Sequence, residues 1–272
     1  MPASSPSLTT LRRELAAAFR LAEKFGYSEG ICNHFSVAVP STGGPVAKRG
    51  AATTSAPEAA LRAGAPSAPE APQNERYLIN PYGLHWSEMR PEHLLLIDGE
   101  GQVIEGDGEV EATARHIHIA GHRANPRHAC ILHVHMPWAT SLTMLKGGRL
   151  EMAHMTAARF YDRVAYQSYG GIALDETEGQ RLAEVAKANQ NADVMFLMHH
   201  GVSIGGPNIA FAFDDLYYLE RACRQQVLAM STGRPLDLLP DAQIKETARQ
   251  YMQLIDFQAQ KHFQALMRVN GL

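Results

Sequence analysis

Apolar residues near the start of the chain recur every three or four positions, which is the spacing of one helix face. This pattern predicts a helix from Thr9 to about Gly26, a residue suited to end a helix. Further helical patterns begin at Glu111 and Pro137, and others fall at 151–159, 178–189, 207–231 and 240–268. Short apolar runs bounded by turn residues predict strands at 34–39, 77–79, 94–97, 103–104, 129–133, 164–166, 194–197 and 202–204.

These elements alternate without a regular strand–helix–strand repeat. We therefore expect a single α/β domain over residues 1–272, with helices on both faces of a mixed sheet. Residues from about 40 to 75 are rich in Ala, Pro, Gly and Ser and hold few large apolar side chains. Such a segment buries too little surface to order itself, so it predicts a flexible surface insertion. The last expected element of this domain is a C-terminal helix at 240–268.

Composition excludes several classes of partner. The 25 basic and 28 acidic residues give a net charge of −3 and form no long like-charge block, so neither nucleic acid nor membrane is expected as a partner. No apolar stretch reaches the roughly 20 residues of a membrane span, and the N-terminus lacks a signal-peptide pattern. Three scattered cysteines make no disulfide framework, which favours a reduced, cytoplasmic protein.

Histidine is frequent, with thirteen copies, and the copies cluster. His133 and His135 end an apolar run that reads as a strand, and residues i and i+2 of a strand point to the same side. The two imidazoles can therefore chelate a metal such as Zn, Fe, Ni, Co or Cu. An His-x-His pair also occurs by chance in a protein core, so the pair alone leaves a structural role open.

A second apolar strand ends in the sequence Met-His-His-Gly at 198–201, which offers a further imidazole at a loop edge. Three nitrogen ligands and an open position are typical of a catalytic metal, whereas a closed structural zinc site needs four ligands. Neither a dinucleotide-binding nor a P-loop glycine motif is present.

The chain resembles the class II aldolase/adducin family, which includes L-fuculose-phosphate aldolase and the adducin head domain. The resemblance spans about residues 8–235 apart from the insertion. It is carried by the segments Ile-Cys-Asn-His-Phe-Ser-Val at 31–37 and Leu-Ile-Asn-Pro-Tyr-Gly-Leu at 78–84, and by the order of the paired histidines and the later His-Gly. The segment 164–172 is most similar to adducin and its bacterial relatives.

This resemblance implies a three-layer α/β/α domain with a central mixed, largely antiparallel sheet, and a homotetramer with active sites between subunits. It implies that His133, His135 and His200, rather than His199, bind a divalent metal. Zn is the first choice of metal, with Fe, Mn, Co and Ni as alternatives. Asn33 and Gly83 align with positions that contact substrate.

The sequence departs from the family at the acid/base position. The family's glutamate aligns with Ala114, nineteen residues before His133, and its two phosphate-contacting serines align with Ala112 and Thr113. Alanine cannot move a proton. Thr113 stays a candidate for substrate binding.

Two residues are candidates for the missing catalytic role. Glu111 is either a substitute acid/base or a capping carboxylate at a helix start. His118 is either catalytic or a hydrogen-bonded core residue. His154 is a further candidate as a proton carrier, with a surface or core role as its alternative.

These features predict a divalent-metal-dependent lyase that acts on a small hydroxy-carbonyl or carboxylate substrate. Aldol cleavage and decarboxylation both pass through an enediolate that a metal stabilises, and the missing glutamate favours decarboxylation. The alternatives are a non-catalytic, adducin-like binding or scaffold protein and an iron-dependent oxygenase on the same fold. The sequence does not name the substrate or the metal.

Overall fold

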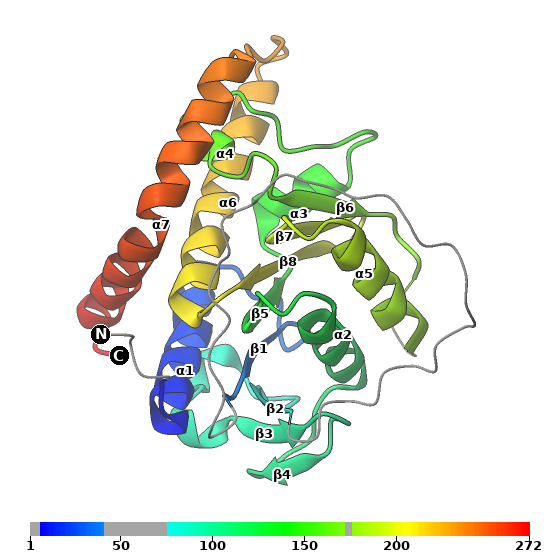
Figure 1. Cartoon of the computed structure of the whole chain (residues 1–272), viewed down its shortest axis with the longest axis vertical. Helices are drawn as coiled ribbons and strands as arrows, with labels where there is room; N and C mark the ends of the chain where they lie inside the picture. Colours follow the sequence, from blue (N-terminus) through cyan, green and yellow to red (C-terminus); the bar gives the residue numbers. More distant parts are fainter. Residues whose placement is uncertain (1–5, 41–74, 172–175) are drawn as a thin grey trace, which may run out of the picture.

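The computed structural model describes residues 6–40, 75–171 and 176–272, so the predicted insertion at about 40–75 lies almost wholly outside the described residues. The described part contains an eight-stranded sheet in the order β4-β3-β2-β1-β5-β8-β7-β6 (Figure 1). Its strands are β1 (His34–Ala38), β2 (Arg76–Ile79), β3 (Leu95–Asp98), β4 (Val103–Glu105), β5 (Cys130–Val134), β6 (Val164–Gln167), β7 (Val194–Leu197) and β8 (Gly201–Gly206). Among these strands β6 and β7 pair in parallel and the other neighbours pair antiparallel.

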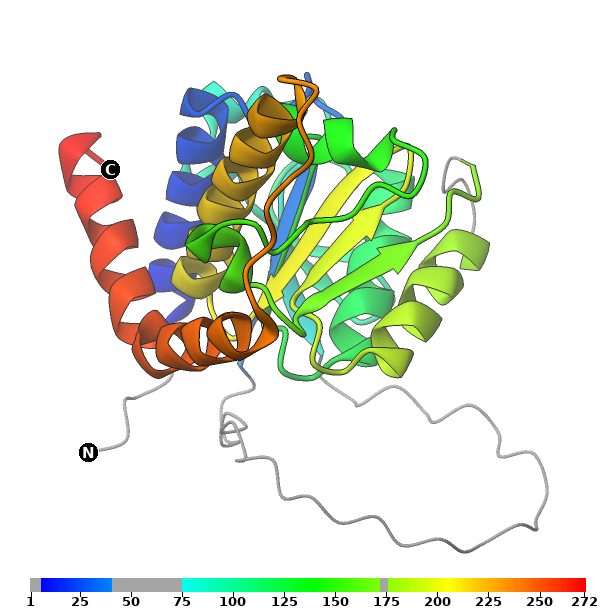
Figure 2. The same cartoon turned by 90° about the horizontal axis from the view of Figure 1, so that it is seen from above.

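Helices cover both faces of the sheet (Figure 2). One face carries α2 (Ala112–Ala124) and α5 (Glu176–Ala188), and the other carries α1 (Leu8–Lys24) and α6 (Ile209–Met230). The helix α7 (Asp241–Val269) packs on the outside of α6, and the short helices α3 (Pro137–Thr143) and α4 (Met155–Ala158) contact α6. The predicted three-layer α/β/α fold with a mixed, largely antiparallel sheet is confirmed. In the described part, no helix is long and apolar enough to cross a membrane.

The main hydrophobic core lies between the sheet and the layer of α1 and α6. The Phe19 ring of α1 stacks on Phe35 of β1 at 4.6 Å and meets the edge of Trp86 at 4.8 Å, and all three side chains are buried. Burial of such rings is the dominant stabilising term of the fold. Ser7 caps α1 by accepting a hydrogen bond from the Thr10 amide at 3.1 Å.

One predicted helix is shorter than expected. The pattern at 151–159 predicts a helix over the whole range, but α4 covers Met155–Ala158. The preceding amides are bound by side chains of other elements, because Leu150 donates to the Tyr166 hydroxyl at 3.0 Å and Glu151 donates to Gln226 at 2.8 Å. The helix begins only after His154, whose backbone is extended and whose ring accepts a hydrogen bond from the Thr156 amide at 3.1 Å.

The antiparallel register determines which side chains lie on the sheet face that α2 covers. On β1, Phe35 and Val37 point to the main core, so His34 and Ser36 point to the α2 side. On β5, His133 stands directly opposite His34. The register therefore brings two histidines from distant parts of the sequence side by side on one face.

A buried network of charges joins α6 to β6 and β7. Arg159 donates to Asp215 at 2.7 Å and also contacts Asp214, while Arg163 donates to Asp193 at 2.8 Å and also contacts Asp215. All five residues are buried. Buried ions persist only when each is paired and hydrogen-bonded, so these segments cannot separate without exposing unpaired charge.

We expect Asp215→Asn to lower the free energy of unfolding by about 3–5 kcal/mol, because it removes the charge that two buried arginines share. Urea denaturation followed by circular dichroism measures the effect. Glu246→Gln is the matched control, since Glu246 pairs with Arg249 at the surface, where solvent screens an ion pair and its contribution to stability is small. Equal losses in the two variants would show that the buried network does not stabilise the fold.

Candidate metal centre

Three histidines converge where β5 and β7 end. His133 lies in β5, His135 follows directly after it, and His200 ends the three-residue turn between β7 and β8. Their nearest ring nitrogens all lie within 4.8 Å of one another. The Nε2 atoms of His133 and His135 are 3.2 Å apart. The structure thus brings together the three residues predicted as metal ligands.

The hydrogen bonds of His133 and His135 fix which ring nitrogen is free. His133 Nδ1 lies 3.0 Å from the carbonyl oxygen of Val202, and His135 Nδ1 lies 2.5 Å from a carboxylate oxygen of Glu29. Both oxygens only accept, so each Nδ1 carries the proton and each Nε2 carries a lone pair. Partners of this kind are those that orient metal-binding histidines in proteins.

Two bare nitrogens at 3.2 Å repel each other unless a cation lies between them. Tetrahedral coordination with Zn–N distances of about 2.0–2.1 Å places two ligand nitrogens about 3.3 Å apart. The donor set and its spacing therefore fit a divalent metal ion such as Zn.

The Met-His-His-Gly turn has a physical reason at each position. His199 has a φ of +61°, a left-handed conformation that histidine adopts more readily than most residues, and this bend brings His200 to the cluster. A Cβ atom on Gly201 would lie 2.6 Å from the Val134 carbonyl oxygen and 2.7 Å from the His135 ring. Only glycine lets the backbone pass this close to a ligand.

Burial keeps the rings of His133 and His200 neutral. Burial and the neighbouring histidines hold the pKa of His133 well below its usual value. Burial and the nearby His135 lower the pKa of His200 to about 4, partly offset by Glu29. A neutral imidazole is the form that binds a metal, so the cluster is ready to bind near neutral pH.

The cluster opens into a cavity of about 450 Å³. Its wall includes the carboxylates of Glu29 and Glu111, the ring of His34, and Tyr82 and Tyr169. A cavity of this size suits a small molecule.

Glu111 and Thr113 lie on the cavity wall, as predicted for site residues. Glu111 is also the N-cap of α2, where it accepts a hydrogen bond from the Ala114 amide at 2.8 Å and another from the Thr113 hydroxyl. This is the geometry of the capping role, so the acid/base role of Glu111 stays a prediction. Ala114, at the position of the missing glutamate, is buried.

The other predicted residues are not among the described residues that line the cavity. His118 is not part of the wall but contacts a residue that is: its Nε2 lies 2.7 Å from Nδ1 of His34. Asn33 is buried and accepts a hydrogen bond from the Glu29 amide at 2.8 Å, so it shapes the loop that carries Glu29. Gly83 has a φ of +88° in the turn next to Tyr82. His154 caps α4, and its ring is likewise absent from this wall.

Two residues of the site, Glu29 and His34, escaped the sequence analysis. Glu29 stands in a loop without periodicity, and nothing local indicates that it reaches His135. His34 lies within a recognised segment, but its place opposite His133 follows from strand pairing, which one sequence does not display. The alternation of His34 and Ser36 with Phe35 and Val37 was the available signal of a polar sheet face.

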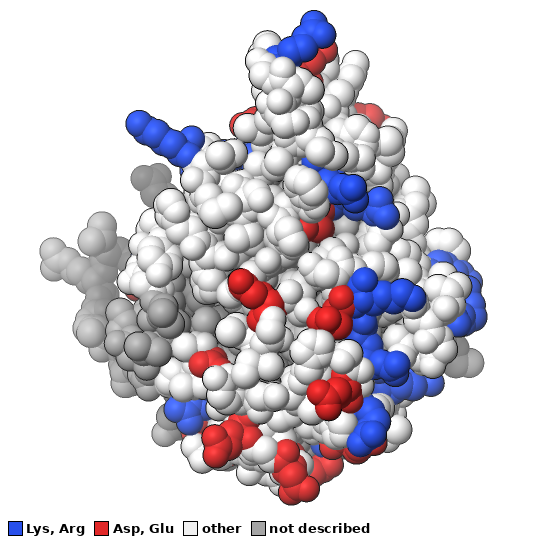
Figure 3. Space-filling view, turned by 180° about the vertical axis from the view of Figure 1, so that it is seen from behind, with Lys and Arg blue, Asp and Glu red and all other residues white. Residues whose placement is uncertain are grey.

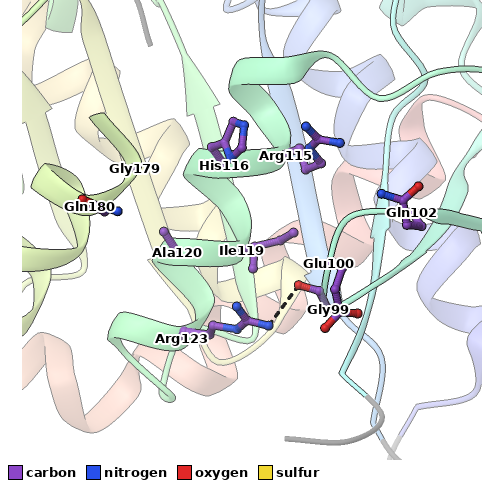
Figure 4. A pocket seen from close by; sticks show the side chains of 10 residues that line it. All are labelled: Gly99, Glu100, Gln102, Arg115, His116, Ile119, Ala120, Arg123, Gly179 and Gln180. Carbon is purple, nitrogen blue, oxygen red and sulfur yellow. Dashed lines mark hydrogen bonds between the residues drawn. The ribbon is translucent and has the colours of Figure 1, made fainter. Parts of the chain in front are cut away.

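A second cavity, of about 530 Å³, lies against a different side of α2 (Figure 4). Arg115, Ile119 and Arg123 of α2 line it, together with the β3–β4 turn and α5. Arg123 crosses its edge to donate to the Gly99 carbonyl at 2.9 Å. None of the residues that line this cavity belongs to the histidine cluster.

We expect His133→Ala and His135→Ala to lose bound metal, because each removes one of three converging nitrogens. Elemental analysis of dialysed protein should find about one divalent ion per wild-type chain. His199→Asn is the control, because His199 lies outside the converging group and asparagine also tolerates the left-handed conformation of this position, so this variant should keep its metal. Loss of metal in His199→Asn with retention in His133→Ala would contradict the assignment.

The metal-free protein should lose stability as the pH falls from 7 to 5. Burial, partly offset by the hydrogen bond to His128, lowers the pKa of His122 from 6.5 to about 4. Below pH 6.5 the His122 ring binds a proton more readily in the unfolded chain than in the folded protein. The folded protein therefore loses stability as the pH falls from 6.5 towards about 4. His122 alone contributes a loss of about 2 kcal/mol by pH 5.

Urea titrations of EDTA-treated protein at several pH values in this range measure the effect, above the pH at which most carboxylates titrate. His122→Gln should show a shallower dependence than wild type. If the stability of neither protein changes with pH, the folded state does not hold the His122 ring neutral.

Comparisons with known proteins agree with this fold. The family described as "Class II Aldolase and Adducin N-terminal domain" matches residues 13–227. A Caulobacter vibrioides protein assigned by its name to aldolase class 2 is 30% identical over 241 residues, which cover 88% of this chain and 80% of that protein. Alpha-adducin of Rattus norvegicus is 28% identical over 233 residues, which cover 84% of this chain but 27% of adducin.

Solved structures show the same architecture. An aldolase II superfamily protein from Pseudomonas syringae is 29% identical with a TM-score of 0.79, covering 97% of this chain and 93% of that chain. L-fuculose 1-phosphate aldolase from Glaciozyma antarctica PI12 shares the fold with a TM-score of 0.75 at 23% identity, covering 100% of this chain and 95% of that chain. The chain belongs to the class II aldolase and adducin family.

Proposed function

We propose that this chain is a divalent-metal-dependent lyase that cleaves a small hydroxy-carbonyl or carboxylate substrate. The observation that carries the proposal is the convergence of three histidines at a cavity of about 450 Å³ on an aldolase fold. The bare Nε2 atoms of His133 and His135 have no evident use in a scaffold, because without a cation they repel each other.

His133, His135 and His200 would hold the metal, with Zn as the first choice and Fe, Mn, Co or Ni as alternatives. When bound, a divalent ion with three protein ligands and an open position supplies Lewis acidity to a substrate oxygen. Glu29 orients His135, and the Val202 carbonyl orients His133.

The wall formed by the start of α2 distinguishes the two candidate reactions. Aldol cleavage requires a base that removes a hydroxyl proton, and Ala114 cannot provide one. Glu111 lies close by, but hydrogen bonds to the Ala114 amide and the Thr113 hydroxyl occupy its carboxylate. Decarboxylation requires no prior removal of a proton, so this wall favours it. Asn33 and Gly83 would act by shaping the loops at the cavity entrance rather than by direct contact.

The proposal extends to a cytoplasmic homo-oligomer, a tetramer by likeness to the family. The three cysteines are unpaired, as expected in a reducing compartment. Leu254 and Phe257 of α7 support an oligomer, because they are large apolar side chains that are more than half exposed.

On the face seen in Figure 3, acidic and basic side chains are interspersed, which is not the single-sign surface that binds nucleic acid.

An adducin-like scaffold is the second candidate, favoured by the 28% identity to alpha-adducin. The convergence of three histidine nitrogens opposes it, because a scaffold does not need three metal-binding groups at one point.

We expect the Zn-loaded protein to release carbon dioxide or an aldehyde from a panel of small hydroxy-acids and hydroxy-ketones, detected by mass spectrometry. His135→Ala should be inactive.

If Glu111 moves a proton, Glu111→Gln should lower kcat by about 100-fold or more. The amide oxygen of glutamine can still accept the Ala114 hydrogen bond, so stability should change by less than about 1 kcal/mol. An unchanged kcat would exclude Glu111 from the mechanism. Turnover by His135→Ala would show that the reaction does not need the metal.

A further inference from the structure

A line of hydrogen bonds runs from the cavity wall into the layer between the sheet and α2. His34 Nδ1 lies 2.7 Å from His118 Nε2, and His118 Nδ1 lies 2.5 Å from Ser36 Oγ. Ser36 Oγ lies 2.7 Å from His122 Nε2, and His122 Nδ1 lies 2.7 Å from the His128 carbonyl oxygen. The side chains of His34, Ser36, His118 and His122 are buried. We call these four residues the histidine relay line.

The last partner sets the direction of every bond in the line. A carbonyl oxygen only accepts, so His122 Nδ1 donates to His128, and His122 Nε2 of the neutral ring accepts from the Ser36 hydroxyl. Ser36 has then used its one proton and accepts from His118 Nδ1. His118 Nε2 must in turn accept from His34 Nδ1. All three rings are therefore the Nδ1–H tautomer.

These hydrogen-bond directions hold for neutral rings, and the surroundings keep the three rings neutral. Burial and neighbouring histidines hold the pKa values of His34 and His118 well below the usual range, and burial lowers that of His122. Among the described residues, the hydrogen-bond partners of the three rings are each other, Ser36 and a carbonyl, with no carboxylate. Tyr77 stacks on His122 at 4.7 Å and covers its face.

The free end of the line is His34 Nε2. This atom has no hydrogen bond to a described residue, yet it is not among the buried polar atoms that lack a partner, which are Asn33 Nδ2, Trp86 Nε1, His93 Nδ1 and Thr140 Oγ1. His34 lines the cavity and its ring lies 4.8 Å from that of His133, whereas His118 does not line the cavity. His34 Nε2 is thus the atom of the line that meets the cavity, and it carries a lone pair.

We propose that His34 is a substrate-contacting residue whose Nε2 is held as a hydrogen-bond acceptor, so that the cavity selects substrates with a hydroxyl group at this point. His118, Ser36 and His122 are positioning residues that fix this orientation. His34 is not in the group of converging ligand nitrogens, so it contacts substrate beside the metal rather than binding it. The substrate preference rests on the proposed function, whereas the ring orientations do not.

Ring tautomers can be measured without metal, substrate or activity. In EDTA-treated protein labelled with nitrogen-15 at histidine, nitrogen–proton correlation spectra distinguish a protonated from a bare ring nitrogen. We expect His34, His118 and His122 each to show a protonated Nδ1 and a bare Nε2. An Nε2–H tautomer at His34 in the wild-type protein would overturn the proposal.

Ser36→Ala tests the line itself, because it removes the acceptor of His118 and the donor to His122. His118 and His34 should then populate both tautomers, while His133, held by the Val202 carbonyl, stays unchanged. Ser203→Ala is the matched control in β8, since the Ser203 hydroxyl bonds to no described residue, and it should leave all spectra as in wild type. Unchanged His34 and His118 signals in Ser36→Ala would overturn the role of the line.

Lactate and pyruvate test the substrate preference, since they differ in whether the second carbon carries a hydroxyl donor or a carbonyl acceptor. Calorimetry with Zn-loaded protein should show lactate binding roughly 10-fold or more tighter than pyruvate, because pyruvate leaves the acceptor unpaired. His34→Phe should bring the ratio of the two affinities towards one, mainly by weakening lactate. His154→Phe, outside the cavity wall, should keep the wild-type ratio.

The outcomes separate the two proposals. Equal binding of both acids, or an unchanged ratio in His34→Phe, would overturn the contact by His34 and leave the metal-dependent function standing. Binding of neither acid, nor of any hydroxy-acid or hydroxy-ketone, would overturn the proposed function and the substrate preference together. The wild-type spectra would then still decide the ring orientations.

Discussion

Strand β5 lies inside the sheet, and its antiparallel pairing with β1 and β8 fixes the positions of His133 and His34. His133 stands opposite His34 on one side and Ser203 on the other. Because side chains alternate along a strand, a shift of one residue in the β1–β5 pairing would turn His133 away from His34. The Val202 carbonyl that orients His133 belongs to the β5–β8 ladder. Strand register therefore positions His133, whereas the turn before β8 positions His200.

The two faces of this sheet hold polar groups by different means. Near β6 and β7, Arg159 and Arg163 are charged and paired with aspartates, so desolvation is offset by opposite charge. On the α2 face, His118 and His122 are neutral and satisfied by a hydroxyl and a carbonyl. The neutral arrangement adds no charge to the cavity beyond the carboxylates of Glu29 and Glu111 on its wall.

Much of the architecture could be predicted from the sequence, because its elements have strong patterns. The first helix was predicted at Thr9 to about Gly26 and is observed at Leu8–Lys24. The exception is 151–159, where His154 has an extended backbone and caps the helix that follows it. Periodicity of apolar residues thus predicts the presence of an element better than the residue at which it begins.

The site was predicted to the extent that its residues are close in sequence or shared with the family. His133 and His135 are two positions apart on a strand, so their convergence follows from strand geometry alone. Glu29 reaches His135 from more than a hundred positions away, and only the folded loop, held by Asn33, brings it there. His118 was identified, but its place behind His34 rather than at the cavity depends on how α2 sits over β1.

Ala114 packs in an apolar cluster with residues of β2 and β3 and is not among the residues that line the cavity, whereas His34 of β1 lines it beside the ligands. The polar group that the sheet offers there is the uncharged Nε2 of His34. A carboxylate can remove a proton and also repels anions, whereas a neutral imidazole fixed as an acceptor orients a hydroxyl without repelling a neighbouring carboxylate group. The site is thereby suited to an acid that carries a hydroxyl group, held by the metal on one side and by His34 on the other.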